Sequence, residues 1–264
     1  MTVTAEPAAA RRALARLYDL DLVEDPGDLD LYVALANRTG GPILELAAGT
    51  GRVAIPLAQA GHRVTAVDLD SAMLERARIA AEQAGAALMG RLELIEADLL
   101  GFEHRDAGTF RLAIIALNSL FLLATRDAQL EAIRTLARHL APGGLAVVDV
   151  WLPDVGDLAR FDGRLMLEYV RTDPETGHEV TKVASARYDV TSAIVDLTSI
   201  HEEGLPGEPA IRWIRRDALR LIGAEELRAN AEAAGLIVEN LAGSYDMEPL
   251  GPGADRAILI ARRP

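Results

Sequence analysis

The stretch from Ile43 to Asp70 reads ILELAAGTGRVAIPLAQAGHRVTAVDLD, and it decides the fold. A short apolar run carrying one acid, Glu45, breaks into a turn of small residues, and a helical pattern follows. A second apolar run then ends in Asp68. A strand, a glycine turn and a helix in this order bring backbone N–H groups close to a ligand. The stretch therefore predicts a ligand-binding βαβ unit.

The same alternation of strands and helices continues along the chain, after a loose start over Met1–Ala10. The periodicity predicts helices over Arg11–Tyr18, Asp28–Asn37, Gly51–Ala60, Ser71–Gly85, Asp127–Leu140 and Ala224–Ala234. It predicts strands over Pro42–Leu46, His62–Val67, Arg91–Ala97, Phe110–Leu117, Leu145–Val150, Leu236–Leu241 and Ala257–Ala261. Such alternation is typical of an α/β fold with a mostly parallel sheet.

The pattern changes between about Arg164 and Leu221, where short runs of β-branched and aromatic residues replace helices. Turn signals separate these runs at Asp173–Gly177 and Glu203–Gly207. We expect an antiparallel meander that forms a lid at the carboxyl edge of the core. The predicted division is therefore residues 1–150 for the N-terminal helices and the core, 151–222 for the insertion, and 223–264 for the end of the core.

Composition narrows the classes of function. The chain has 264 residues, 50% of them hydrophobic, a net charge of −13 and no cysteine. The negative charge disfavours nucleic acid and anionic membrane surfaces as partners, and the absence of cysteine excludes disulfides and thiolate metal sites. No apolar run approaches the roughly 20 residues that span a bilayer. We expect a soluble cytoplasmic protein without a metal site.

A dinucleotide is one candidate ligand for the glycine turn. Gly49-Thr50-Gly51-Arg52-Val53-Ala54 fits the pattern G-x-G-x-x-[GA], and Asp68 ends the second strand where a ribose-binding acid is expected. Glu45 argues against this candidate, because an acid just before the turn adds negative charge near a pyrophosphate. A ligand with a positive charge would instead be favoured, and a strand of a parallel sheet is buried on both faces.

Later motifs extend the pattern in order. The chain then resembles a class I S-adenosylmethionine-dependent methyltransferase of the small-molecule type, with a Rossmann-like, three-layer fold. The resemblance covers roughly Tyr18 to Arg263 and rests on Glu45, Gly49 and Gly51, Asp68, Asp98-Leu99 and Pro142-Gly143-Gly144. It implies a sheet of seven strands with the last strand antiparallel. One departure is Ala47, where the family usually has a glycine; alanine fits there if its φ is negative.

The resemblance implies which residues contact the cofactor. The region of Glu45 and Ala47 would receive its ammonium group, Gly49 and Gly51 would line its amino-acid portion, and Asp68 would bind both ribose hydroxyls. The remaining contacts would be Leu69 and Met73 on the adenine ring, Asp98 and Leu99 at its amino group and edge, and Leu117 and Asn118 at the methyl-bearing end. Ordinary core packing is an equally good interpretation of Leu69, Met73 and Leu117.

The acceptor side is less defined. The candidates for substrate binding, chosen by position, are Tyr18, Asn118, Trp151, Tyr169, Arg212 and Trp213. Asn118-Ser119 resembles a pair found in related enzymes, but Leu120-Phe121-Leu122 follows instead of a histidine, so no catalytic base is predicted. His201 is interpreted as a solvated residue. The basic string from Arg212 to Arg216 is interpreted first as a salt-bridged surface.

The sequence thus predicts in-line methyl transfer from S-adenosylmethionine to an N or O atom of a small molecule, yielding S-adenosylhomocysteine. An NAD(P)-dependent oxidoreductase and a non-catalytic scaffold that binds S-adenosylmethionine stay open as alternatives, and a homodimer is left open as the assembly. Fold alone does not separate these functions.

Overall fold

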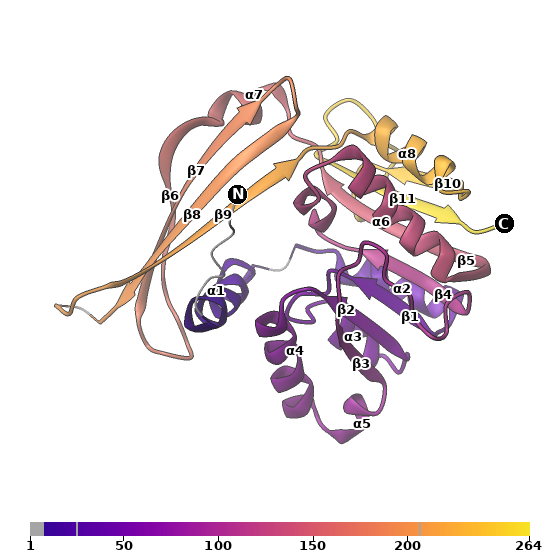
Figure 1. Cartoon of the computed structure of the whole chain (residues 1–264), viewed down its shortest axis with the longest axis horizontal. Helices are drawn as coiled ribbons and strands as arrows, with labels where there is room; N and C mark the ends of the chain where they lie inside the picture. Colours follow the sequence, from indigo (N-terminus) through magenta and orange to yellow (C-terminus); the bar gives the residue numbers. More distant parts are fainter. Residues whose placement is uncertain (1–7, 25, 206) are drawn as a thin grey trace. The chain divides into compact units, whose positions relative to one another are not determined.

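The computed structural model describes residues 8–24, 26–205 and 207–264, which form two compact units (Figure 1). One unit contains residues 26–154 and 222–264, and the other contains residues 8–24 and 155–221. Most of the predicted loose start, and residue 206 of the predicted turn at Glu203–Gly207, lie outside the described residues. The larger unit holds the glycine turn and is described first.

A sheet of seven strands forms the centre of the larger unit. Its strands are β1 (Ile43–Leu46), β2 (Val64–Asp68), β3 (Leu92–Glu96), β4 (Phe110–Ile115), β5 (Leu140–Trp151), β10 (Ile237–Ala242) and β11 (Arg256–Arg262). They lie in the order β10-β11-β5-β4-β1-β2-β3. Strands β1 to β5 are parallel to one another, whereas β11 runs antiparallel to both β5 and β10. The predicted mostly parallel sheet with an antiparallel last strand is confirmed.

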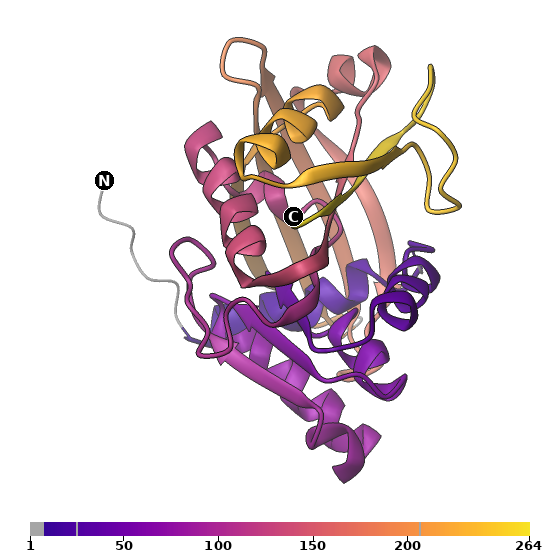
Figure 2. The same ribbon diagram turned by 90° about the vertical axis from the view of Figure 1, so that its right-hand side faces the viewer.

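Helices pack on both faces of this sheet (Figure 2). They are α2 (Leu29–Thr39), α3 (Ala54–Gln59), α4 (Ser71–Ala84), α5 (Ala86–Met89), the 3₁₀ turn η1 (Ser119–Leu122), α6 (Arg126–His139) and α8 (Ala224–Ala233). Side chains cap two of them: Asp70 accepts from the N–H of Ala72 at 2.8 Å, and Thr125 accepts from Ala128 at 3.1 Å. These caps satisfy N–H groups that have no partner inside the helix, which fixes where α4 and α6 begin.

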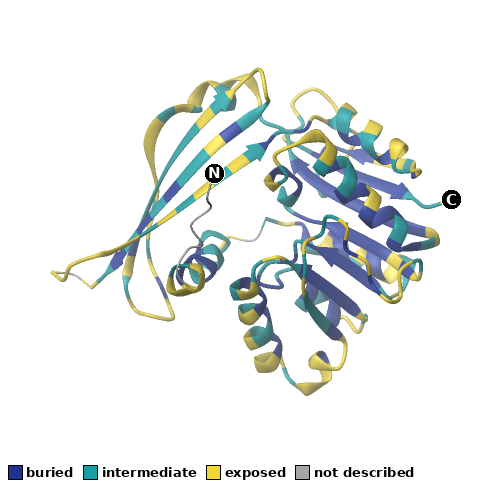
Figure 3. Ribbon diagram, viewed as in Figure 1, coloured by how far each residue is buried: buried dark blue, intermediate teal, exposed yellow. Residues whose placement is uncertain are grey.

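The core of the larger unit is aliphatic. All four residues of β1 are buried, and Leu44, Leu112 and Ile114 are fully enclosed. Figure 3 shows the strands of this sheet as buried, with exposed residues gathered on the outer faces of the helices. A strand enclosed on both faces gives a nearly continuous apolar run, so each acid inside such a run stands out.

The Pro142-Gly143-Gly144 turn differs from the sequence-based prediction. We expected it to separate a helix from a strand beginning at Leu145, but β5 already begins at Leu140 and the turn is an irregularity within the strand. Gly143 has a φ of +77°, and a Cβ on Gly144 would lie 2.9 Å from the carbonyl oxygen of Phe110. The two glycines therefore let β5 bend while it stays paired with β4.

The smaller unit is an antiparallel sheet with one long helix against it. It contains α1 (Ala8–Asp21), α7 (Val155–Arg160), β6 (Asp162–Thr172), β7 (Glu179–Asp189), β8 (Ile194–Gly204) and β9 (Ile211–Arg220), with the strands in sequential order. The predicted antiparallel insertion is confirmed. Helix α1 groups with this sheet, through Leu17 and Leu20 against Val180, whereas the predicted division placed it with the core.

No helix among the described residues combines the length and the apolar character that crossing a membrane requires.

Candidate functional site

The glycine turn lies at the carboxyl end of β1, where the strand order of the sheet reverses. Strand β1 pairs with β2 on one side and with β4 on the other, so the connections leave in opposite directions. Open α/β sheets bind ligands in the crevice at such a point. The candidate site is therefore built around the carboxyl ends of β1, β2 and β4.

The backbone at Ala47 corrects a prediction. Its φ is +58°, in the left-handed region, so the condition on which alanine was expected to fit, a negative φ, is not met. The turn folds back so that the N–H of Ala48 bonds to the carbonyl of Val67 on β2 at 3.0 Å, and this pairing favours the strained conformation over relaxation. For a residue with a Cβ this conformation costs roughly 1–2 kcal/mol. Strain of this kind gathers at ligand sites.

Gly49 and Gly51 both adopt left-handed backbone conformations. Their φ values are +58° and +83°. A Cβ on Gly51 would lie 3.0 Å from Cδ1 of Ile55 and 3.2 Å from Cβ of Ala77, so a side chain there would press on both residues. The positive φ values of the two glycines let the turn bring its backbone close to a ligand.

Glu45 is the acid enclosed beneath this turn. It is only 2% exposed, and its Oε2 atom has no hydrogen-bond partner among the described residues. Burial raises the pKa of Glu45 to about 8; the positive charge of Arg52 opposes the shift, and the negative charge of Asp68 adds to it. A buried carboxyl with a vacant acceptor atom is a group that a cationic ligand would stabilise.

Asp68 ends β2 and holds the turn from the other side. Its Oδ2 accepts from the N–H of Gly49 at 2.7 Å, and its Oδ1 accepts from the N–H of Asp70 at 2.8 Å. Burial raises the pKa of Asp68, and these two N–H groups partly offset that shift. The carboxylate is thus fixed in orientation, with lone pairs left for further hydrogen-bond donors.

The residues predicted around the adenine ring differ in exposure. Leu69 is 67% exposed, which rules out core packing for it, whereas Met73 is buried in α4. Asp98 is exposed and accepts from the N–H of Leu100 at 2.9 Å, as expected of a loop acid. The carbonyl of Leu99 accepts from the hydroxyl of Thr135 on α6 at 3.0 Å. None of these observations tests contact with an adenine ring, so that contact stays a prediction.

Leu117 and Asn118 form a tight turn at the end of β4. Both have positive φ, +44° and +65°. The N–H of Asn118 bonds to the carbonyl of Asp149 at 3.1 Å, and its Oδ1 accepts from the N–H of Trp151 at 2.5 Å. Asn118 thereby ties the end of β4 to the end of β5 and places Trp151 at the same edge of the sheet.

Two ion pairs at this edge escaped the sequence analysis. Arg52 in the glycine turn makes a bidentate pair with the fully buried Asp28, with both N–O distances 2.6 Å. The pair joins the turn to the residue before α2. The sequence carries a signal for this pair, because an arginine directly after the glycine turn requires an acidic partner if its side chain is enclosed.

The second ion pair lies on β5. Asp149 is fully buried, accepts from the hydroxyl of Tyr245 at 2.7 Å, and pairs with Arg256 at 2.5 Å. Arg256 also stacks over the ring of Tyr245 at 4.4 Å, which fixes the loop between β10 and β11. The argument used for Glu45, an acid inside an apolar strand, would also have identified Asp149.

The other acceptor candidates, Tyr18, Tyr169, Arg212 and Trp213, belong to the smaller unit. The hydroxyl of Tyr169 donates to Asp21 at 2.7 Å, and Nε1 of Trp213 donates to Glu203 at 2.7 Å. Arg212 pairs with Glu202, which agrees with the interpretation of the basic string as a salt-bridged surface.

His201 corrects a prediction in the same unit. We expected a solvated residue, but it is 3% exposed, and its Nε2 lies 3.8 Å from Asp21 at the end of α1. The side chain is enclosed because it lies on the face of β8 that α1 covers.

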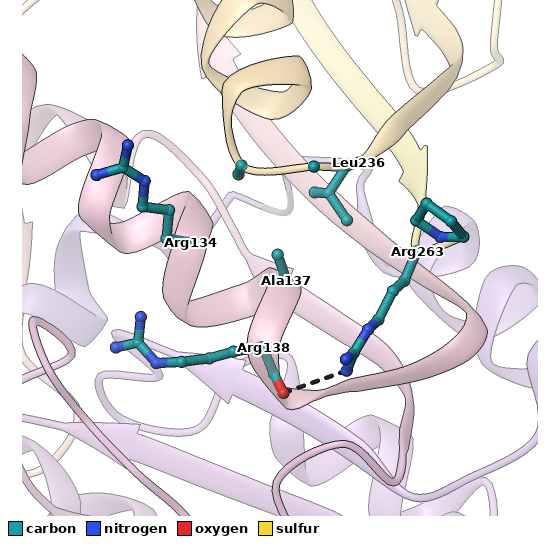
Figure 4. Close-up of a pocket in the computed structure, with 8 residues that line it drawn as sticks. Arg134, Ala137, Arg138, Leu236 and Arg263 are labelled. Atoms are coloured by element: carbon teal, nitrogen blue, oxygen red, sulfur yellow. Dashed lines mark hydrogen bonds between the residues drawn. The ribbon is translucent and has the colours of Figure 1, made fainter.

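Two hollows lie away from the glycine turn. One, of about 460 Å³, is lined by the ends of α6, α8 and β11; Figure 4 shows Arg263 reaching the carbonyl of Arg138, at 3.3 Å. The other, of about 570 Å³, lies where β2, β3 and β4 begin. Both are at the amino edge of the parallel strands, opposite the candidate site.

Comparison with known proteins finds a family that matches the part of the chain containing the glycine turn. Residues 43–144 match the family described as "Methyltransferase domain". The chain is 27% identical over 236 residues to the cypemycin N-terminal methyltransferase of a Streptomyces species, covering 85% of this chain and 84% of that one.

Two further likenesses extend over most of the chain. The dTDP-3-amino-3,4,6-trideoxy-α-D-glucopyranose N,N-dimethyltransferase of Streptomyces venezuelae is 25% identical over 241 residues, 87% of this chain and 92% of that one. The fold matches that of SAM-bound CalS10, an amino pentose methyltransferase from Micromonospora echinaspora, with a TM-score of 0.68 and 19% identity. The match covers 94% of this chain and 97% of that one.

Proposed function

Since this chain is a class I S-adenosylmethionine-dependent methyltransferase, we propose that it methylates an amine nitrogen of a small molecule, and that the glycine turn of β1 holds the cofactor. S-adenosylmethionine supplies an electrophilic methyl group on a sulfonium centre. The chain's own residues then have to bind the cofactor, orient it and align an acceptor with it.

The residues of the turn fit the amino-acid portion of the cofactor. Glu45 offers a buried carboxyl whose Oε2 is unpartnered, which suits an ammonium group. Gly49 and Gly51 hold left-handed backbone conformations, which suit a turn whose backbone lies close to a ligand. This fit is the observation that carries the assignment of the cofactor site.

Asp68 is proposed as the ribose-binding residue. Its carboxylate is held by two N–H groups, so binding a diol there costs little additional side-chain entropy. Leu69, which is exposed beside it, is proposed to cover one face of the adenine ring, with Met73, Asp98 and Leu99 completing that pocket.

An amine acceptor is proposed because one relative above is named as an N,N-dimethyltransferase of an amino sugar and the other as an N-terminal methyltransferase. An unprotonated amine is a sufficient nucleophile towards a sulfonium methyl group, so the reaction needs alignment more than a strong base. The absence of a histidine in Leu120-Phe121-Leu122 is compatible with this requirement. Asn118 and Trp151 are proposed to shape the acceptor end of the site.

The test is a methylation assay with matched acceptors. The protein is incubated with S-adenosylmethionine and with pairs of small molecules that differ only in an amino or a hydroxyl group, and products are read by mass spectrometry. We expect one added methyl group on amines and none on the matched alcohols. Methylation of the alcohols alone would refute the amine proposal, and binding of NAD(P) instead of S-adenosylhomocysteine would refute the cofactor site.

The acceptor candidates of the smaller unit are tested separately. Substitution of Tyr18, Tyr169, Arg212 or Trp213 by alanine is expected to raise the KM for the acceptor while leaving the Kd for S-adenosylhomocysteine unchanged. A change in the cofactor Kd with no change in KM would remove that residue from the acceptor site.

A further inference from the structure

A hollow of about 570 Å³ lies at the amino edge of the parallel sheet, where β2, β3 and β4 begin (Figure 1). Its lining contains three arginines, Arg63, Arg91 and Arg105, together with apolar residues such as Val64 and Phe110. The volume falls within the roughly 300–1,000 Å³ of small-molecule sites. The glycine turn lies at the opposite edge of the sheet, so the proposed methyl transfer gives this hollow no role.

The sheet register places Arg63 and Arg91 side by side. Val64 pairs with Leu92 in the parallel ladder of β2 and β3, and the N–H of Val64 bonds to the carbonyl of Arg91 at 2.8 Å. The residues directly before this pair therefore stand at the same level of the two strands. Since both arginines line the hollow, two positive charges border the same space. Like charges next to each other on adjacent strands destabilise a sheet.

The two acids that line the hollow, Glu93 and Asp106, have other partners. Oε2 of Glu93 accepts from the hydroxyl of Thr65 at 3.3 Å and lies 3.2 Å from Nε2 of His104. Oε1 of Glu93 pairs with Arg105 at 3.1 Å, and the same guanidinium lies 3.7 Å from Asp106. Arg105 thus has its counter-charges within the wall of the hollow.

Arg63 and Arg91 lack such counter-charges. Both side chains are exposed, and neither forms an ion pair with a residue in the part of the chain that the structure describes. The chain has 40 acidic residues against 27 lysines and arginines, so a shortage of acids does not explain this. An anion in the hollow would offset the repulsion between the two arginines. Because the net charge of −13 repels anions at long range, these local groups would have to hold it.

We propose that the hollow binds the phosphate group of a small phosphate ester through Arg63 and Arg91. A phosphate monoester carries about −1.5 to −2 charges at pH 7, which two guanidinium groups match, and each guanidinium can donate two parallel hydrogen bonds to its oxygens. A carboxylate carries one charge, which one arginine satisfies. The organic part of the ester would lie against the apolar residues of the lining. The proposal depends neither on the methyl acceptor nor on the cofactor site.

The test is a titration of the full-length protein with phenyl phosphate, with and without S-adenosylhomocysteine, followed by amide chemical shifts in NMR. We expect saturable shifts in residues 63–65 and 91–93, and a Kd that S-adenosylhomocysteine does not change. Benzoate, which keeps the ring but carries one charge, should bind roughly tenfold more weakly. Inorganic phosphate, which lacks the organic part, should also bind more weakly than phenyl phosphate.

Three glutamine variants test the arginines. Arg63→Gln and Arg91→Gln each remove one charge-assisted contact and should each raise the Kd for phenyl phosphate by roughly tenfold. Arg111→Gln is the matched control, because Arg111 is also exposed near the start of a strand, β4, but does not line the hollow. It removes the same charge and should change the Kd by less than about twofold at 0.1 M salt. Circular dichroism checks that each variant is folded.

Absence of saturable phenyl phosphate binding would overturn the proposal. So would displacement of phenyl phosphate by S-adenosylhomocysteine, which would place the ligand at the glycine turn, or an equal loss of affinity in Arg111→Gln, which would reduce the binding to a general effect of charge. Benzoate or inorganic phosphate binding as tightly as phenyl phosphate would refute a phosphate ester as the ligand class.

Discussion

Replacing Glu45 by glutamine should stabilise the protein at neutral and alkaline pH and weaken cofactor binding at the same time. The unfolded chain ionises this side chain near its ordinary pKa of 4.5, whereas burial holds the folded pKa at about 8. Between these values the unfolded state releases a proton that the folded state keeps, so stability falls as pH rises and levels off above pH 8. Glutamine cannot ionise, so the variant lacks this loss.

The size of the effect follows from the two pKa values. A shift from 4.5 to about 8 corresponds to a limit of roughly 5 kcal/mol at 1.36 kcal/mol per pKa unit, of which about 3 kcal/mol is lost by pH 7. Glutamine introduces buried N–H donors that cost about 1–3 kcal/mol if they find no partner, at every pH. The difference in free energy of unfolding between variant and wild type therefore changes with pH, even if the pH-independent cost of the glutamine donors cancels part of it.

Urea unfolding of both proteins at pH 5 and pH 8 measures this difference. We expect the stability of the variant relative to wild type to increase by about 3 kcal/mol between the two pH values. Glu96→Gln, at the exposed end of β3 in the same sheet, is the control and should show no such change. Equal pH dependence in Glu45→Gln and wild type would refute the assignment of Glu45 as a buried, protonated acid.

Glu45→Gln should weaken cofactor binding although it raises the stability of the fold. An ammonium group beside Glu45 favours the carboxylate, so binding of S-adenosylhomocysteine by the wild type at pH 7 should release a proton. Calorimetry in buffers of different ionisation enthalpy detects that proton. Glu45→Gln should bind at least roughly tenfold more weakly, which is about 1.4 kcal/mol, without proton release. Unchanged affinity would contradict the proposed role of Glu45.

Three further outcomes are expected. Ala47→Gly removes left-handed strain of roughly 1–2 kcal/mol and adds about 0.4–1 kcal/mol of unfolded-state entropy, a net stabilisation of about 0–1.6 kcal/mol, so the Tm should rise by up to about 6 °C in calorimetry; a fall would contradict the strain assigned to Ala47. Asp68→Ala should abolish most binding of S-adenosylhomocysteine while circular dichroism shows a retained fold, and retained binding would contradict the ribose assignment. Tyr245→Phe leaves an oxygen of Asp149 without its donor and should cost about 1–3 kcal/mol in urea unfolding, whereas a neutral result would mean that water replaces the hydroxyl.

The order of the elements could be predicted because each carries a local signal. Strand β1 is enclosed on both faces and therefore reads as an apolar run, and Asp70 stands directly before α4 as its cap. The bend of β5 at Pro142–Gly144 could not be predicted, because proline and glycine also end helices and only the pairing with β4 distinguishes the two cases.

The long-range partners could not be predicted for a different reason. Arg52 and Asp28 lie 24 residues apart, and Asp149 and Arg256 lie 107 apart, so no periodicity connects them. The burial of His201 likewise depends on where α1 packs, since alternation along β8 gives two faces but does not say which one a helix covers. The positive φ of Ala47 arises from the pairing of its neighbour with β2 and has no signal in the residue itself.

Glu45 and Asp149 are both buried in the central sheet, but only Glu45 is assigned to the cofactor. Both stand on strands that are apolar on each side, and an enclosed carboxylate without partners costs several kcal/mol. Asp149 has a tyrosine hydroxyl on one oxygen and an arginine on the other, and both partners oppose the rise in its pKa that burial causes. Glu45 keeps an oxygen that no described residue bonds, directly beneath a strained turn at the carboxyl edge of the sheet. A buried carboxyl that lacks a partner at the ligand-binding edge of the sheet is best explained by a ligand that binds it. Glu45 is therefore assigned to the cofactor, and Asp149 to the structure of the sheet.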